Sequence, residues 1–151
     1  MCRKRGLYQG IHLIMTRYLL GTNILIHHQR GFFNIGEYLK EHDISIDDCY
    51  VSEITAIEIK VGEQMLKRKG YKFSVKSEDL LSNFNVLPIS DCVDYFVEEK
   101  CRLQFAGTPM ANNFDLLIGC TAVVNDMVMV TENIKDFKNI ENIIIENWIS
   151  R

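Results

Sequence analysis

The sequence has no long apolar run. Nowhere in its 151 residues does an uninterrupted apolar stretch reach the roughly 18 residues that a transmembrane helix needs, so no membrane span is expected. A basic stretch at residues 3–5 resembles the start of a secretory signal. However, Gln9, His12 and Arg17 interrupt the apolar segment that a signal requires, which argues against one.

Two kinds of motif are also missing. No glycine-rich phosphate loop of the G-x-G-x-x-G or P-loop type occurs, which argues against a nucleotide-binding α/β protein. The five cysteines contain no C-x-x-C pair, and their number is odd: Cys2, Cys49, Cys92, Cys101 and Cys120. We therefore expect reduced thiols in a cytoplasmic protein, and no zinc site.

An overall excess of positive charge is absent too. The net charge is −3 and the pI is about 5.8, so no global basic field favours nucleic acid. A nuclease is not excluded, because bound metal ions can supply positive charge at the reacting phosphate. The clearest local basic cluster comprises Lys60, residues 67–69, Lys72 and Lys76. It is either a phosphate-contacting surface or a solvated helix end that suits the helix dipole.

The composition fits one globular domain. Hydrophobic residues make up 47% and charged residues 25% of the chain, enough for a sizeable core, and no internal repeat or linker is visible. A second methionine, Met15, stands shortly before the first apolar run. We expect residues 1–14 to be an N-terminal extension and residues 15–151 to form the single domain.

Strand-like and helix-like segments alternate along the chain. Strands are predicted at 18–20, 44–51, 85–89, 127–130 and 143–146. Helices are predicted at 23–30, 35–42, 55–69, after Ser90 or Asp91 up to Gly107, at 114–124 and at 134–138, and residues 71–84 are expected to be mostly helical. This alternation predicts an α/β fold with a parallel sheet covered by helices on both faces.

Helical spacing also predicts which faces are buried. Ile57, Val61 and Met65 recur every four residues and are expected to form the buried stripe of their helix. In the next long helix a broad apolar stripe comprises Val93, Val97, Cys101 and Phe105. In the helix at 114–124 the inward residues are expected to be Leu117, Cys120, Thr121 and Val124.

The break between the first strand and the first helix is where such a fold places its chemistry, because parallel strands bring their carboxyl ends to one edge of the sheet. Thr22 or Asn23 is expected to cap the helix that follows. The tip itself carries Gly21, which offers no side chain.

Three acids stand out, each three residues after a potential capping residue: Glu58 after Thr55, Asp115 after Asn112, and Asp136 after Asn133. Each acid, taken singly, is explained by a capping box, in which the carboxylate meets free backbone N–H groups at a helix start.

The acids also share a placement, because each is predicted to follow a strand or turn and to open a helix. A parallel sheet could bring all three to one edge, where they would repel unless a cation lay between them. Oxygen-only ligands select a hard ion such as Mg²⁺ or Mn²⁺. Such an ion can orient a water, lower its pKa and stabilise charge on a phosphodiester.

Four stretches and the end of the chain resemble the PIN-domain nucleases, particularly the VapC-like toxins of bacterial toxin–antitoxin pairs. They are residues 18–26, 51–58, 107–119 and 130–137, with a closing stretch at 146–148, in the order and with the spacing typical of that family. The resemblance covers roughly residues 16 to 148.

The resemblance implies a PIN-like three-layer fold and a Mg²⁺- or Mn²⁺-dependent endoribonuclease that cleaves cellular RNA. It makes Asp115 and Glu58 metal-site acids. Asp136 would be a further acid of the site, the fourth when the Asp that the family has at position 21 is counted, and Asn133 would share or replace the role of Asp136. It makes Thr22 and Thr131 candidates to support the ligands through their hydroxyls, although buried threonines with purely structural hydrogen bonds are the alternative. It also implies a small cognate antitoxin protein as partner, and a homodimer.

Gly21 is a departure from the family, whose first strand ends in a metal-binding Asp at this position. The activity of this chain is therefore expected to be reduced or lost. The alternative function is a non-catalytic module with the same fold that binds RNA or a protein partner. Gly21 favours that alternative, and retention of the three acids opposes it.

Overall fold

The computed structural model describes residues 6–8, 12–72 and 75–151. Its centre is a five-stranded sheet in the order β5-β4-β3-β6-β7, in which every neighbouring pair is parallel. The strands are β3 (Tyr18–Leu20), β4 (Cys49–Ser52), β5 (Asn85–Leu87), β6 (Val128–Val130) and β7 (Ile145–Glu146). The predicted α/β class is confirmed.

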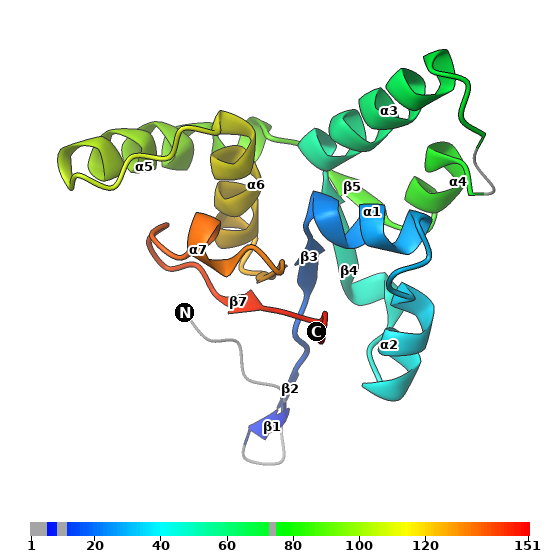
Figure 1. Ribbon diagram of the computed structural model, residues 1–151. Helices are drawn as coiled ribbons and strands as arrows, with labels where there is room; N and C mark the ends of the chain where they lie inside the picture. The colour runs from blue at the N-terminus through cyan, green and yellow to red at the C-terminus, as the bar shows by residue number, and fades with distance from the viewer. Residues whose placement is uncertain (1–5, 9–11, 73–74) are drawn as a thin grey trace.

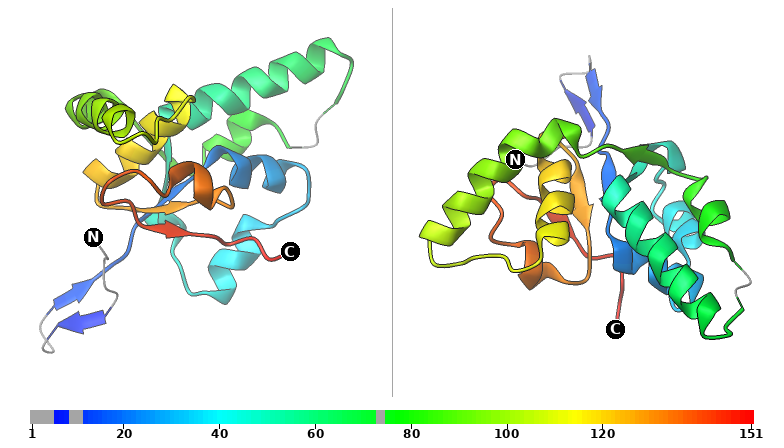
Figure 2. Two further views of the ribbon diagram at one scale, coloured as in Figure 1. Left: turned by 60° about the vertical axis from the view of Figure 1, so that its left-hand side comes forward. Right: turned by 90° about the horizontal axis from the view of Figure 1, so that it is seen from above.

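Helices cover both faces of this sheet (Figures 1 and 2). They are α1 (Thr22–Gln29), α2 (Ile35–Glu41), α3 (Glu53–Arg68), α4 (Ser77–Leu81), α5 (Val93–Phe105), α6 (Asn113–Val124) and α7 (Ile134–Phe137). Because strand side chains alternate between faces, Tyr18 and Leu20 pack into the core on the side of α1, α2 and α4. Leu19 packs into the second core, with α5, α6 and α7. The central strand is thus buried on both sides.

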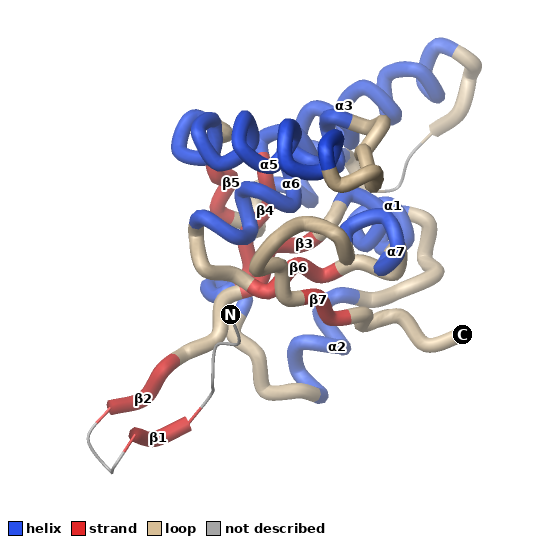
Figure 3. The backbone as a smooth tube through the Cα atoms, turned by 90° about the vertical axis from the view of Figure 1, so that its left-hand side faces the viewer, coloured by secondary structure: helices blue, strands red, loops and turns tan. Residues whose placement is uncertain are grey.

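A separate antiparallel hairpin precedes the sheet. It pairs β1 (Gly6–Tyr8) with β2 (His12–Ile14) and, among the described residues, forms its own two-stranded sheet. Figure 3 shows it projecting from the body of the fold. No helix in the described part of the chain is long and apolar enough to cross a membrane.

Several predicted helix starts are wrong. Helix α1 begins at Thr22 with Gly21 as its N-cap, and neither Thr22 nor Asn23 provides a cap. Helix α3 begins at Glu53, where the Ser52 hydroxyl accepts a hydrogen bond from the Ile54 N–H at 3.1 Å. Thr55 therefore lies inside the first turns of α3, fully buried, and the capping explanation of Glu58 does not hold.

Helix α5 also starts differently. A short 3₁₀ turn, Ser90–Cys92, precedes it, so Cys92 is its N-cap and no side-chain hydrogen bond caps it. The strand predicted at 44–51 is shorter, because a second 3₁₀ turn at Ile46–Asp48 leads into β4. Between 71 and 84 only α4 is helical, and residues 73–74 lie outside the described residues.

The predicted buried stripe of α3 is wrong. Ile57, Val61 and Met65 are 48%, 55% and 55% exposed, while Ile54 and Ile59 face the core. Helix α3 therefore presents apolar side chains to solvent.

The apolar stripe of α5 is exposed as well. Val93, Val97, Cys101 and Phe105 lie on its outer face, with Phe105 92% exposed, whereas Leu103 is buried. In α6, Cys120 and Thr121 are buried as predicted and Leu117 is half-buried and packed on the core. The prediction for Val124 is wrong, since it is exposed.

Candidate active site

The tip of β3 lies directly beside the tip of β6, since Leu20 is paired with Val130. The Gly21 N–H donates a hydrogen bond to the Val130 carbonyl at 2.9 Å. A Cβ atom at Gly21 would lie 2.9 Å from that same oxygen and 3.1 Å from Cε of Met129. A side chain at position 21 therefore requires the Val130 backbone to shift.

A cleft of about 330 Å³ opens at this edge of the sheet, and we call it the acid cleft. It is lined from four elements, including Gly21, Thr22, Glu58, Asp115, Thr131 and Asn133. Two predicted site acids, one on α3 and one on α6, thus lie in one cavity with the Gly21 position.

Glu58 is held in the acid cleft by a hydroxyl chain. The Thr22 hydroxyl donates to Oε1 of Glu58 at 2.7 Å and lies 3.0 Å from the hydroxyl of the buried Thr55. Because Thr22 has one hydroxyl hydrogen, Thr55 must be the donor to Thr22. These hydrogen bonds run from Thr55 on α3 to Thr22 on α1 and back to Glu58 on α3, and they fix the orientation of the Glu58 carboxylate.

Asp115 stands in the first turn of α6. The Asn112 side chain caps this helix, as predicted, accepting hydrogen bonds from the N–H groups of Phe114 and Asp115 at 3.0 and 3.3 Å. Burial raises the pKa of the Asp115 carboxyl, and the negative charges of Glu58 and Asp136 raise that pKa further. The ionised form of Asp115 is therefore disfavoured where it stands.

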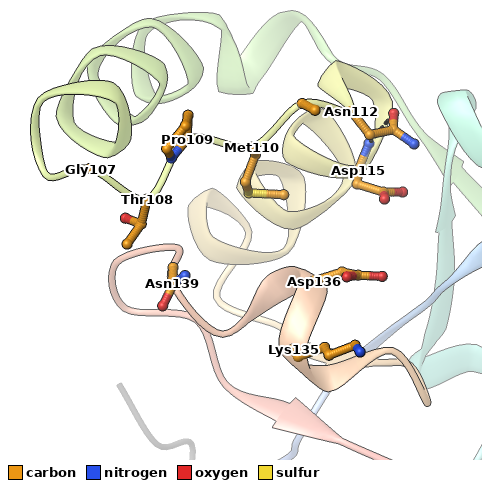
Figure 4. A pocket seen from close by; sticks show the side chains of 10 residues that line it. Gly107, Thr108, Pro109, Met110, Asn112, Asp115, Lys135, Asp136 and Asn139 are labelled. Atoms are coloured by element: carbon orange, nitrogen blue, oxygen red, sulfur yellow. Dashed lines mark hydrogen bonds between the residues drawn. The ribbon is translucent and has the colours of Figure 1, made fainter.

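Asp136 lies on the first turn of α7, next to the acid cleft. It lines a neighbouring pocket of about 520 Å³, of which Asp115 is also part (Figure 4). Asn133, the N-cap of α7, makes no side-chain capping bond, and its N–H donates to the Thr131 hydroxyl at 3.0 Å. The Asn133 side chain lines the acid cleft instead of closing a capping box with Asp136.

Within the described part of the chain, no group of three or more His, Cys, Asp or Glu side chains is close enough to hold a metal ion. The acid cleft nevertheless offers two carboxylates and the side-chain amides of Asn23, Asn112 and Asn133, whose oxygens are ligands that suit a hard ion. Magnesium usually keeps several waters and is bound through one or two protein carboxylates. Glu58 and Asp115 fit that requirement, and a cation between them would favour the ionised form of Asp115, whose pKa is raised first by burial and then by the charges of Glu58 and Asp136.

The second pocket was not predicted from the sequence. Its walls are the loop at 107–112 and the segment that contains Lys135 and Asn139. Lys100 on α5 holds the loop, donating to the Met110 carbonyl at 3.3 Å and to Oδ1 of Asn113 at 2.6 Å. Gly107, with a φ of 77°, starts the loop in a left-handed conformation, and this glycine was the one sequence signal for a turn there.

A narrow groove of about 110 Å³ separates α1 from α3. Its lining includes Ile26, Gln29, Leu66 and Glu58, so Glu58 lines both the groove and the acid cleft. The Nε2 atom of Gln29 is buried and finds no hydrogen-bond partner among the described residues.

Comparisons with known proteins give consistent results. No family profile matches the chain. The ribonuclease VapC2 of Rickettsia felis is 35% identical over 136 residues, which cover 87% of this chain and 97% of that protein. The ribonuclease VapC1 of Haemophilus influenzae (strain R2866) is 29% identical over 133 residues, with the same coverage of 87% and 97%.

Solved structures agree with the sequence relatives. The crystal structure of VapBC2 from Rickettsia felis, bound to a DNA fragment from its promoter, contains a chain that matches with a TM-score of 0.70 and 29% identity, covering 89% of this chain and 100% of that one. VapBC-1 from nontypeable Haemophilus influenzae matches with a TM-score of 0.66 and 26% identity, over 88% and 98% of the two chains.

Proposed function

We propose that this chain, which belongs to the VapC family of ribonucleases, is the toxin of a toxin–antitoxin pair, and that its active site is the acid cleft. The observation that carries the site assignment is that Glu58 and Asp115, from two different helices, meet Gly21 in one cavity at the carboxyl edge of the sheet. Neither acid is needed there to complete a capping box.

The residues of the acid cleft fit a Mg²⁺ or Mn²⁺ ion held by Glu58 and Asp115, with the Asn133 amide at its side and Asp136 close enough to add to the negative potential. When bound, such an ion activates water and stabilises the charge that develops on the phosphodiester. Thr22 keeps the Glu58 carboxylate in place through its 2.7 Å hydrogen bond. Asp115 contributes the second carboxylate, and a cation beside it would favour the ionised form that burial and the neighbouring acids disfavour.

The Gly21 position limits this activity. An aspartate at the strand tip would add a third carboxylate to the acid cleft, and Gly21 supplies none. Loss of one transition-state-stabilising group typically lowers a rate by about 10²–10³. We therefore propose that the chain has the fold of an endoribonuclease with reduced or no cleavage activity.

The experiment that tests this proposal is a series at Gly21. The Gly21→Asp variant should bind Mg²⁺ or Mn²⁺ more tightly and cleave RNA about 10²–10³ times faster than the parent chain, with EDTA abolishing cleavage. Gly21→Asn has nearly the same shape without the charge, and Gly21→Ala adds the Cβ atom alone. Both controls meet the Val130 carbonyl as the aspartate does, so they report the steric effect separately.

The outcomes separate two functions. If only Gly21→Asp gains metal affinity and cleavage, the acid cleft is a nuclease site that lacks one ligand. If none of the three variants gains either property although all remain folded, the nuclease assignment fails. The closed backbone at Gly21 then favours the second candidate, a non-catalytic module that binds RNA or protein with the same fold.

The groove between α1 and α3 is the place we propose for the antitoxin. Its apolar walls suit a peptide segment, and the buried, unpartnered Nε2 of Gln29 can donate to a peptide carbonyl. An occupant of this groove would touch Glu58 and so reach the wall of the acid cleft. The four described cysteines are all free thiols, which supports a cytoplasmic location for the pair.

The exposed apolar side chains of α3 and α5 support the proposal of a homodimer. Ile57, Val61 and Met65 on α3, and Val97 and Phe105 on α5, form solvent-facing apolar stripes. Both helices lie on the same side of the molecule (Figure 2). Sedimentation analysis should show a dimer that Val97→Glu dissociates.

We further propose that residues 15–151 form the single PIN domain and that residues 1–14 are an extension to it. The separate pairing of the hairpin among the described residues supports this division.

A further inference from the structure

We propose that the pocket between the loop at 107–112 and α7 is a nucleotide subsite, which holds the base of an RNA residue next to the phosphate in the acid cleft. This inference rests on the proposed ribonuclease function. We call the cavity the loop pocket; its volume is about 520 Å³, within the range of about 300–1,000 Å³ typical of small-ligand sites.

The loop pocket adjoins the acid cleft. Asn112 and Asp115 line both cavities, so a strand whose phosphate lies at Asp115 has its next nucleotide at the entrance of the loop pocket. A flexible single strand can place its base there, because unstacked bases of single-stranded RNA can be splayed out and read by side chains.

The charges in the loop pocket are distributed unevenly. Figure 4 shows Asp115, Asp136 and Lys135 toward one end, and Thr108 and Asn139 toward the other. Lys135 is exposed and forms no ion pair with another described side chain, so its ammonium group is available to a phosphate oxygen. The backbone of the RNA would therefore lie at the charged end, and its base would extend toward the uncharged end.

The uncharged end carries the groups that base recognition needs. Thr108 has a hydroxyl and Asn139 has an amide, which together supply donors and acceptors for a base edge. Pro109 and Met110 form an apolar wall between the two ends, against which a flat base can pack.

The loop pocket is rigid enough to select a ligand. Lys100 ties the loop to α5 through the Met110 carbonyl, and the Thr108 N–H donates to the Leu103 carbonyl at 3.0 Å. On the opposite wall, Arg102 donates to the carbonyl of Asn139 at 2.8 Å. Both sides of the pocket are thus anchored on α5, so little conformational freedom has to be lost on binding.

The test measures binding of a fluorescein-labelled, single-stranded hexaribonucleotide to the full chain by fluorescence anisotropy, with Mg²⁺ present and RNA integrity checked on a gel. Lys135→Met should weaken binding about 5-fold and lower the slope of log affinity against log salt by about 0.7, the value for one lost phosphate contact on a single strand. Lys138→Met is the matched control, because Lys138 is exposed, only three residues away, and outside the loop pocket. It should leave affinity and slope unchanged.

Base recognition is tested with hexaribonucleotides in which one residue at a time is abasic. In the parent chain one abasic position should lower affinity by about 5-fold or more, as loss of a stacked base does. In the double variant Thr108→Val, Asn139→Ala, the intact RNA should bind roughly 5-fold more weakly through loss of hydrogen bonds, and the abasic position should matter less.

The proposal is overturned if Lys135→Met and Lys138→Met behave alike, or if the double variant keeps the full response to the same abasic position. Cleavage by Gly21→Asp, measured separately, distinguishes this failure from failure of the proposed function. If that variant cuts RNA while the loop-pocket variants have no effect, the subsite is wrong and the ribonuclease assignment stands. If Gly21→Asp cuts no RNA and no variant binds RNA, the subsite and the ribonuclease assignment are both wrong.

Discussion

The strand side and the helix side of the acid cleft differ in whether they supply a carboxylate to the site. On the strand side, Gly21 offers no ligand and the Val130 carbonyl has closed to the distance of a hydrogen bond. On the helix side, Glu58 and Asp115 project into the cavity, and the surroundings raise the pKa of Asp115. A carboxylate present only to cap its helix would have its charged form stabilised. The strand tip thus leaves little room for a side chain at position 21, whereas burial and two neighbouring acids on the helix side act against the charge of Asp115.

The largest expected effect comes from removing the helix-side acids after the strand-side ligand is restored. In a Gly21→Asp background, Glu58→Gln and Asp115→Asn should each lower Mg²⁺ affinity at least about 10-fold, since even indirect supporting groups are typically worth 10–100-fold. Isothermal titration calorimetry provides the measurement. Glu98→Gln, at an exposed position on α5, is the control and should have no effect. Equal affinities in all these proteins would show that the two acids bind no metal.

An effect on stability, and not on metal binding alone, is expected where the two sides meet, at Thr22. Thr22→Val removes the donor to Glu58 and leaves the buried Thr55 hydroxyl without its acceptor in the hydroxyl chain. The free energy of unfolding should fall by about 1.5–3 kcal/mol, as for a hydrogen bond to a charged group. Urea denaturation measures this change, and Thr22→Ser, which keeps the hydroxyl, should recover most of it. A loss of the same size in Thr22→Ser would assign the effect to packing instead.

The substitution Asp115→Asn should give a smaller change in stability, of opposite sign, that depends on pH. Because its pKa is raised above the ordinary value of 3.8, the native state binds the proton more tightly than the unfolded chain does. In metal-free protein this group therefore lowers stability progressively as the pH rises above 3.8. Asp115→Asn should melt at a higher temperature than the parent at pH 7, and the difference should disappear near pH 4. A lower melting temperature at pH 7 would restore the helix-start explanation of this acid.

No effect on stability is expected from deletion of residues 1–14. The hairpin is paired within itself and shares no strand pairing with the five-stranded sheet among the described residues. Differential scanning calorimetry should give the same melting temperature for residues 15–151 and for the full chain. A large fall would contradict the division into extension and domain.

The alternation of strands and helices was predictable because buried parallel strands are short apolar runs and most helices are marked by their stops. Gly31, Gly70 and Gly107 all adopt a positive φ directly beyond a helix, which is why they signalled helix ends. Helix starts were harder. Ser52 rather than Thr55 caps α3, because several residues near one another can cap and the choice depends on where the preceding strand ends.

The apolar stripe of α3 could be recognised from spacing, but its environment could not. A repeat of four places Ile57, Val61 and Met65 on one face, and nothing in that repeat says whether the core or another molecule covers it. The same limit applies to the site. Strand and helix order predicted that Glu58 and Asp115 could meet, whereas the loop pocket depends on long-range contacts such as that from Arg102 to Asn139.

The shared position of Glu58 has a consequence for control of the site. One side chain forms part of the wall of the acid cleft and part of the wall of the groove between α1 and α3. An ion in the cleft and a peptide in the groove would both interact with that carboxylate, so their binding free energies are coupled. Such coupling is reciprocal: if the peptide weakens ion binding by some factor, the ion weakens peptide binding by the same factor. The concentration of free divalent ion would then influence how tightly the peptide in the groove is bound. A cell with little of that ion would keep the complex of peptide and chain for longer.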